Sequence, residues 1–506
     1  MGCVTAGSLP VGTPGLHRPH PPPVTTKHGE LIAVRAPGVE RWSWALYDFA
    51  NTIFSMNVVS LFFAVWLISD LGASNTSVAL ATGLTSALVA LSVPILGAIS
   101  DARQQRKPWI VTFTLLAVAA TAAIGVAGYA MAPPVGDSLV GSEPPGTQTI
   151  SRSALLVILS AYVVANYMYQ AAMPFYNAML PELAPPGEWG RLSGMGAAIG
   201  YVGSIVGVML VTPFFSGALP VFGDLPDGLV NGLRTIVPFT GRGGRVSTFV
   251  PTALLFLLFS LPLFIFCRDH RPRPRAPVRV KRAFADVIAA VRETRRYPGA
   301  LRFLITSFLY QDAMGTIIMF MALYAVEAVG FREGIETTLF VVLTLPAVVG
   351  SYLWGKLIDS VGPKKTLSVV LISWLLLLTA LIFVPGVTAF WIIGAGIGLI
   401  YGGIATAERP LLLTLVPDVE SGRFFGLMVL SARTAAITGP LSWSIAVDYL
   451  QPVMGPGFAY RAAVGTVIIS FALALYVLRK VPDNFRLLAT DSGRHAPGHP
   501  LPPDWP

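Results

Sequence analysis

The chain has 506 residues, of which 54% are hydrophobic and only 12% charged, and its formal net charge is +9. Because a soluble globular domain carries about 25% charged residues, this composition excludes a water-soluble enzyme. Two cysteines, Cys3 and Cys267, are too few for a disulfide framework, and the six histidines lie in the tails and one loop. We therefore expect neither a zinc site nor a cofactor, and the positive charge does not require a nucleic-acid partner.

Long apolar segments occupy most of the chain, and a membrane helix needs about 17 to 25 such residues. Six of them contain no charged residue: 77–100, 109–131, 153–180, 192–223, 246–267 and 462–478. Three more contain one ionisable residue each: 42–69 with Asp48, 303–326 with Asp312 and 424–447 with Arg433. A shorter span at 337–355, and a long run at 366–407 that Pro385 and Gly386 divide in two, bring the expected number of membrane helices to twelve.

The charged residues between these spans predict the topology. Most of the 35 lysines and arginines fall on one side if the amino terminus is inside, so both termini are expected in the cytoplasm. We expect a disordered tail at 1–40, a six-helix bundle at 41–267, a basic cytoplasmic linker at 268–302, a second six-helix bundle at 303–481 and a cytoplasmic tail at 482–506. The linker spacing Val280, Phe284, Val287, Ile288 and Val291 favours an amphipathic helix on the membrane face, and a solvated linker is the alternative.

Three pairs of segments repeat across that linker. Gly97 to Asp101 with trailing basic residues matches Gly355 to Asp359, and Tyr47-Asp48 matches Tyr310-Gln311-Asp312. The third pair consists of Pro181-Glu182 with Gly190-Arg191, and Pro417-Asp418 with Gly422-Arg423. Repeated six-helix halves are typical of transporters, whose substrate site lies between the halves.

The Gly-x-x-x-Asp loops resemble the signature loop of the major facilitator superfamily. The segments 44–51, 175–182, 200–203 and 438–441 resemble its vacuole-effluxer-like branch, whose fungal members export amino acids from the vacuole. The resemblance implies an all-α transporter with twelve membrane helices in two pseudo-symmetric halves and no enzymatic activity. It implies a plasma (inner) membrane location in a prokaryote and a vacuolar one in a fungus. We expect a monomer whose partners are a small-molecule substrate and the lipid bilayer.

The carboxylates in the first and seventh spans are the primary candidates for substrate or proton binding. A charged side chain at the bilayer centre costs about 2.5 to 3.5 kcal/mol, so it normally faces a polar interior. Asp48 shares one helical face with Asn51, and Asp312 shares one with Thr316. The alternatives are that each carboxylate holds a structural hydrogen-bond network, or that Asp48 sits in the wet interface.

Polar residues in the fourth span follow one helical face. Asn166, Tyr169 and Gln170 would suit a polar or zwitterionic solute, and helix packing is an equally weighted alternative. We expect Glu408 to form an interfacial ion pair with its neighbour Arg409 at the end of the tenth span.

Arg433 lies near the middle of its span and needs a partner, because a guanidinium keeps its proton. It could bind a substrate carboxylate in bidentate fashion or neutralise Asp312 or Asp48 in the empty carrier. A purely structural ion pair is the third possibility.

The superfamily resemblance also implies gating contacts. It places Asp101 near Arg423 and Asp359 near Arg191, which would close the cytoplasmic side.

The sequence carries no ATP-binding motif, so a gradient or the solute itself must supply the energy. Proton coupling through Asp48 or Asp312 is the default hypothesis, because desolvation favours the protonated carboxyl. The preferred function is a secondary carrier of a small polar solute, with amino acids as the first guess. An exporter of amphipathic drugs or lipids and a non-transporting membrane sensor are the alternatives.

Overall fold

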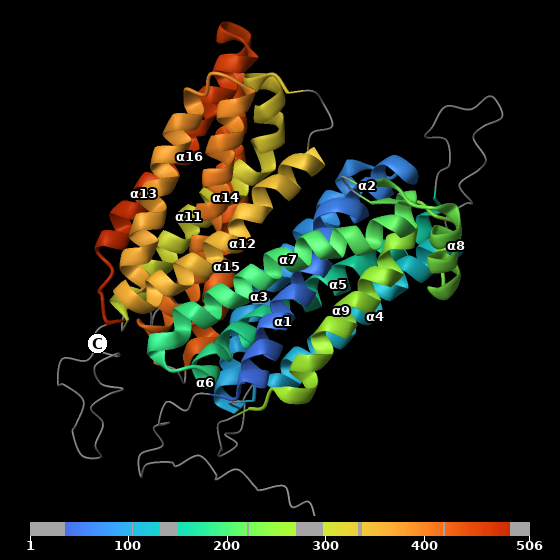
Figure 1. The fold of residues 1–506 in the computed structure, drawn as a ribbon, viewed down its shortest axis with the longest axis horizontal. Helices are drawn as coiled ribbons and strands as arrows, with labels where there is room; N and C mark the ends of the chain where they lie inside the picture. Colours follow the sequence, from blue (N-terminus) through green and yellow to red (C-terminus); the bar gives the residue numbers. More distant parts are fainter. Residues whose placement is uncertain are drawn as a thin grey trace, which may run out of the picture.

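The protein is described by a computed structural model that covers residues 36–103, 105–131, 150–219, 222–269, 297–331, 336–417 and 420–485. Within these ranges it consists of two bundles of long helices (Figure 1). The expected disordered tail, the amphipathic linker helix and the carboxyl-terminal tail fall largely outside the described residues.

The amino-terminal half begins with α1 (Gly38–Phe54), which continues through the π-helical turns η1 (Ser55–Phe62) and η2 (Trp66–Asp70) around the short α2 (Phe63–Val65). Its other long helices are α3 (Asn75–Arg103), α4 (Lys107–Met131), α5 (Arg152–Ala178), α7 (Trp189–Ser216) and α9 (Phe249–Phe266). The connecting elements are α6 (Leu180–Leu183), η3 (Pro186–Glu188), β1 (Ala218–Leu219), β2 (Gly223–Asp224), α8 (Asp227–Ile236) and η4 (Arg245–Thr248). Strands β1 and β2 pair antiparallel.

The carboxyl-terminal half consists of α11 (Pro298–Tyr324) with η5 (Ala325–Val329), α12 (Glu336–Val361), α13 (Pro363–Ile382), α14 (Val387–Leu413), α15 (Ser421–Met454) and α16 (Pro456–Arg479). Among the described residues of the two halves, ten helices are long and apolar enough to cross a membrane. Helices α12 and α15, with 26 and 34 residues, complete the second bundle. The expected architecture of twelve helices in two halves is confirmed.

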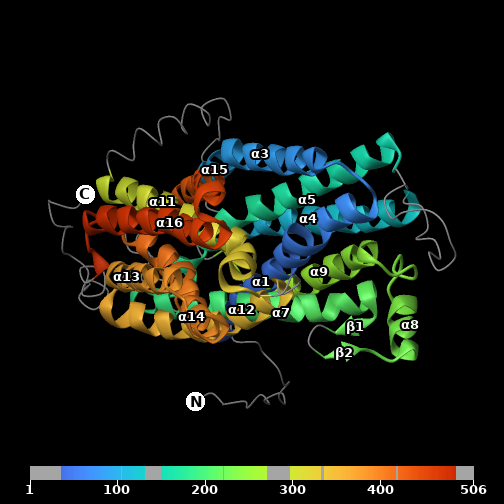
Figure 2. The same ribbon diagram turned by 90° about the horizontal axis from the view of Figure 1, so that it is seen from above.

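The apolar runs predict most helix ends to within a few residues, but α12 and α15 end six and seven residues later than expected and α7 ends seven residues earlier. The turn at Pro385 and Gly386 separates α13 from α14 as expected. The expected span 192–223 was wrong in its last turns, because Gly217 adopts φ = 75° and ends α7 at Ser216. The chain then forms the β1–β2 hairpin and α8, which lie at one end of the amino-terminal half (Figure 2).

The two halves meet at one end of the molecule and diverge toward the other (Figure 1). Helix α7 contacts α12 and α14, and helix α15 contacts α3 and α5. Glycines permit these close approaches, since a Cβ atom on Gly194 would lie 2.5 Å from the carbonyl oxygen of Ser351, and one on Gly97 would lie 2.5 Å from that of Gly422. Helix α1 starts and α16 finishes at this same end, which we call the terminal end.

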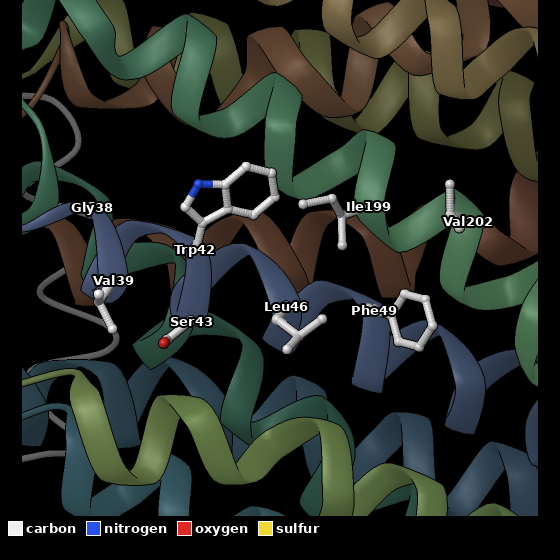
Figure 3. A pocket seen from close by; sticks show the side chains of 8 residues that line it. All are labelled: Gly38, Val39, Trp42, Ser43, Leu46, Phe49, Ile199 and Val202. Carbon is white, nitrogen blue, oxygen red and sulfur yellow. The ribbon is translucent and has the colours of Figure 1, made fainter.

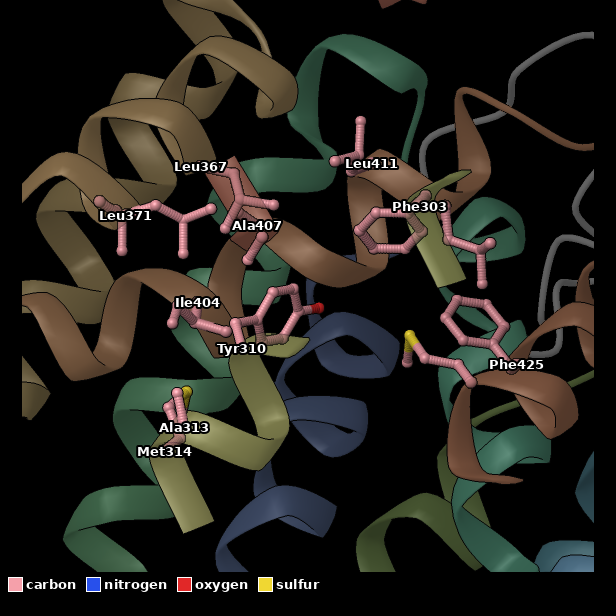
Figure 4. Close-up of a cluster of buried hydrophobic side chains, with 14 of the residues drawn as sticks. Phe303, Tyr310, Ala313, Met314, Leu367, Leu371, Ile404, Ala407, Leu411 and Phe425 are labelled. Carbon is pink, nitrogen blue, oxygen red and sulfur yellow. The ribbon is translucent and has the colours of Figure 1, made fainter. Parts of the chain in front are cut away.

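Apolar side chains, many of them aromatic, fill the interior of the two bundles. In the carboxyl-terminal half, Phe303 and Tyr310 of α11 pack among side chains of α13, α14 and α15 (Figure 4). Trp374 of α13 stacks on Phe471 of α16 with ring centroids 5.0 Å apart. This apolar cluster continues into α1, α5 and α7 where the halves meet, and a second cluster lies within the amino-terminal half.

Candidate functional site

A buried ion pair joins the two halves. Asp48 of α1 accepts hydrogen bonds from the guanidinium of Arg409 of α14 at 2.9 and 3.3 Å. Only 5% of Asp48 and 8% of Arg409 is exposed. The guanidinium carbon lies 5.5 Å from the ring centre of Trp44 and 5.4 Å from that of Tyr176, so two aromatic rings also contact the cation.

The aromatic pair fixes the position of Asp48. Trp44, one turn before Asp48, stacks on Tyr176 of α5 with centroids 4.6 Å apart. The indole of Trp44 donates to the carbonyl of Tyr176, and the hydroxyl of Tyr176 donates to the carbonyl of Trp44, both at 3.1 Å. A Cβ atom on Gly196 of α7 would lie 2.7 Å from Oδ2 of Asp48, so this glycine makes room for the carboxylate.

Arg409 is the partner that the sequence did not predict. We expected Glu408 and Arg409 to form an interfacial pair, and this was wrong because the two side chains leave α14 in different directions. Arg409 reaches Asp48, whereas Oε2 of Glu408 accepts hydrogen bonds at 3.2 Å from Tyr310 and Gln311 of α11. Glu408 therefore lies within the carboxyl-terminal half.

Asp312 has a different environment from Asp48. It is 6% exposed and accepts hydrogen bonds from the hydroxyls of Thr438 on α15 and Ser470 on α16. Thr316 donates to the backbone carbonyl of Asp312 at 2.7 Å. Among the described side chains, no cation lies within ion-pair distance of Asp312. The side chain of Arg433 is not among those described, so its expected partner stays a prediction.

The amides of α5 and α1 form a buried polar seam inside the amino-terminal half. Gln170 donates to Asn166 at 2.9 Å, and Asn51 donates to the sulfur of Met173 at 3.3 Å. The ring of Tyr169 lies 4.8 Å from that of Phe54. The side-chain oxygens of Gln170 and Asn51 are buried without a hydrogen-bond partner in the described structure. Such atoms normally have a protein or water partner.

Asn57 of η1 is a further buried amide that the sequence did not single out. It is 1% exposed, and neither its amide nitrogen nor its amide oxygen has a partner among the described residues. It lies in the π-helical turn η1, where the residue phase departs from the α-helical one. A helical-face analysis that starts from Asp48 therefore misses it.

The terminal end carries a second set of contacts between the halves. Asp359 of α12 accepts hydrogen bonds from the backbone N–H groups of Gly190 and Arg191, at 2.8 and 3.0 Å, and so caps the start of α7. The Arg191 guanidinium is 3.9 Å away and its side chain is 55% exposed. Burial raises the pKa of Asp359 to about 7, although the two N–H groups act in the opposite direction. The side chain of Asp101 is not described, and its pairing with the half-buried Arg423 stays a prediction.

Arg106 forms an additional contact across the halves. Its guanidinium, 1% exposed, contacts Glu182 at 2.8 Å and Ser421 at the start of α15 at 3.0 Å. Two features of the sequence could have predicted this contact: the basic cluster after Asp101, and the proline followed by an acidic residue that recurs as Pro181-Glu182 and Pro417-Asp418. These residues were assigned to the repeat and not to the interface.

A groove of about 650 Å³ opens on the outside of the amino-terminal half between α1 and α7 (Figure 3). Trp42 and Leu46 of α1 and Ile199 of α7 are among its lining residues, and Ser43 contributes the single polar side chain of that lining. It therefore offers no charged partner to a polar solute and is distinct from the Asp48–Arg409 pair.

The two bundles and the polar contacts between them define a transporter of the major facilitator type. Similar solved structures include the human organic anion transporter MFSD10, with a TM-score of 0.62, 12% identity and coverage of 87% of this chain and 100% of that one. The fucose:proton symporter FucP of E. coli has a TM-score of 0.60, 14% identity and coverage of 88% and 98%.

Within that class, the chain belongs to the vacuole effluxer Atg22-like family, whose profile matches residues 65–482. The uncharacterized MFS-type transporter YxiO of Bacillus subtilis is 25% identical over 452 residues, covering 87% of this chain and 94% of that protein. The multidrug resistance protein MdtG of Salmonella paratyphi C is 28% identical over 235 residues, covering 46% and 54%. The protein is thus an integral multi-pass membrane transporter that moves a solute by secondary transport, and it is not an enzyme.

Proposed function

We propose that this protein is a proton-coupled carrier that moves a small polar solute by alternating access, and that amino acids are the first class of solute to test. The terminal end faces the cytoplasm in this proposal, because Arg41, Arg106, Arg191 and Arg423 lie there and cationic residues favour the cytoplasmic side. The conformer described above is then closed to the cytoplasm. We expect the carrier to work as a monomer.

The observation that carries this proposal is the Asp48–Arg409 pair. It joins two bodies that have to move relative to each other during alternating access. Separating a buried ion pair leaves uncompensated charges, which costs about 3 to 5 kcal/mol when one partner is removed. The separated groups therefore need replacement partners. A carboxylate on Arg409 and an ammonium group or a proton on Asp48 would supply them, and an amino acid carries both of these charges.

The buried seam supports a polar solute rather than an apolar one. The amide oxygens of Asn51 and Gln170 lack partners in the described structure, and so do both amide atoms of Asn57 on η1. An amide oxygen accepts and an amide nitrogen donates, so the seam can bind hydroxyl, amide or ammonium groups of a solute or the waters that accompany it.

Asp312 is the proposed proton carrier. Its partners, Thr438 and Ser470, are hydroxyl groups, which can donate to a carboxylate or accept from a carboxylic acid. Asp312 can therefore gain or lose a proton without losing its hydrogen bonds. Asp48 differs in this respect, because protonation would deprive Arg409 of its counter-charge.

A second candidate function is export of amphipathic drugs. It is favoured by the partial similarity to MdtG and by the aromatic side chains in the core of the amino-terminal half, where Phe63 stacks on Tyr162 with centroids 3.9 Å apart. An aromatic surface suits flat apolar cargo better than a zwitterion.

Counterflow in liposomes tests both candidates. Purified protein would be reconstituted, loaded with each unlabelled amino acid of a panel or with an amphipathic cation, and supplied with the labelled form without an imposed gradient. We expect amino-acid accumulation in the wild type and in Asp448→Asn, a control that removes an exposed acid of α15 outside the site. Accumulation of amphipathic cations alone would favour the exporter. Saturable binding without any flux would instead indicate a sensor.

A further inference from the structure

Helix α8 and its hairpin form a small extramembrane unit at the end of the amino-terminal half opposite the terminal end (Figures 1 and 2). The unit is inserted between two membrane helices, α7 and α9. Its presence is not required by the transport site, which lies between the halves.

The inner side of this unit is fixed to the bundle. Val230 is 6% exposed and packs on Gly217, and Thr240 is fully buried and donates to the carbonyl of Val237 at 2.7 Å. Three arginines tie the unit to three helix ends. Arg234 donates to the carbonyl of Phe214, Arg242 to that of Tyr129, and Arg245 pairs with Asp70.

The outer side is apolar and uncovered. Leu229 is 51% exposed and Ile236 78%, and together with Leu233 they follow the i, i+4, i+7 spacing of one helical face. Phe222 before the helix is 75% exposed and Phe239 after it is 41% exposed. A soluble surface rarely leaves such a cluster open to water.

We propose that this apolar face of α8 inserts into the lipid interface of the bilayer leaflet on the side away from the terminal end. The two membrane helices that the unit connects also expose apolar side chains, such as Leu210 on α7 and Leu254 on α9, which are 44% and 48% exposed. An amphipathic helix in this position buries its apolar face about 5 to 10 Å into the boundary between headgroups and acyl chains.

The charges around α8 favour contact with lipid chains over contact with anionic headgroups. The exposed acidic residues Asp224 and Asp227 flank the start of the helix, and the cation of Arg234 is used in hydrogen bonds to the bundle. Apolar insertion therefore provides the attraction. Because the arginines bind the ends of α7, α4 and η2, this contact holds the amino-terminal half at a fixed depth while the other half moves.

Site-specific fluorescence in lipid nanodiscs tests this inference. Single cysteines would be introduced as Leu229→Cys and Ile236→Cys, with Asn231→Cys and Thr235→Cys as matched controls on the polar side of α8, all with Cys3→Ala. Cys267 can stay, because its thiol is buried and so is shielded from labelling. Each variant would carry an environment-sensitive fluorophore in phosphatidylcholine nanodiscs, with and without lipid that bears a nitroxide near the start of the acyl chain.

We expect blue-shifted emission and quenching by the nitroxide lipid at positions 229 and 236, and water-like emission with little quenching at 231 and 235. Equal quenching at all four positions would overturn the proposal, as would no quenching at 229 and 236. A blue shift at 229 and 236 without nitroxide quenching would mean that a protein surface, such as a second copy of the chain, covers the face, and this outcome also overturns it. The readout does not require transport, so it is independent of the proposed function.

Discussion

The first helices of the two halves carry corresponding carboxylates in opposite roles. Asp48 pairs with a cation of the other half, whereas Asp312 accepts hydroxyl hydrogen bonds from its own half. The two acids thus occupy corresponding positions in different surroundings. In the function proposed above, Asp48 controls the contact between the halves and Asp312 holds the proton.

Removing the cation of the cross-half pair should have the largest effect. Arg409→Ala leaves Asp48 buried without a counter-charge, so we expect loss of exchange and a fall of about 3 to 5 kcal/mol in the free energy of unfolding. Counterflow and thermal unfolding of the purified variant measure the two effects. Wild-type exchange in Arg409→Ala would contradict the role given to this pair.

Asp312→Asn should separate the two acids functionally. The amide keeps partners for Thr438 and Ser470 but cannot exchange a proton, so we expect counterflow to persist while accumulation driven by a proton gradient is lost. Uptake into liposomes with and without an imposed pH difference provides the comparison. If the pH difference still drives accumulation in this variant, the proton is carried elsewhere.

The contact at the terminal end should depend on Asp359 more than on Arg191. Asp359→Ala removes two hydrogen bonds from backbone N–H groups to a charged acceptor, each worth about 1.5 to 3 kcal/mol. Arg191→Ala removes only an exposed cation 3.9 Å away. We expect increased labelling of a cysteine that replaces the buried Ser193, on a Cys3→Ala background, in the first variant and little change in the second. Equal effects of the two substitutions would contradict this prediction, because the loss of the guanidinium alone would then account for the loss of the contact.

Closure at the terminal end should also depend on pH, with a smaller effect than the substitutions above. Burial raises the pKa of Asp359 to about 7 in the closed conformer, whereas a hydrated aspartate titrates near about 3.9. The closed conformer therefore binds the proton more tightly, so lowering the pH from above 7 toward 4 should favour closure at the terminal end. The labelling assay above, repeated across this range, should show less labelling at acid pH in the wild type. Asp359→Asn should remove that dependence.

Sequence reasoning predicted the architecture because charge-free runs and repeated loops are local patterns. It overextended the span at 192–223, because a single left-handed glycine, Gly217, ends α7 where hydropathy does not change. The partner of Asp48 could not be predicted, since Arg409 lies 361 positions away and its neighbour Glu408 suggested a local pair. Asp312 was singled out as a candidate for substrate or proton binding, which stays a prediction, and its hydroxyl partners on α15 and α16 could not be predicted because they depend on how the bundle packs.

The most direct test of the central claim is a double-mutant cycle on the free energy of unfolding, with Asp48→Asn, Arg409→Gln and the double variant. The cycle isolates the coupling between the two residues and would be measured with and without a saturating amino acid that the carrier exchanges. We predict a coupling of about 3 kcal/mol in the empty carrier and a clear decrease when the amino acid is bound, because the solute takes over both charges. The same coupling in both conditions would contradict the claim that the solute replaces this pair.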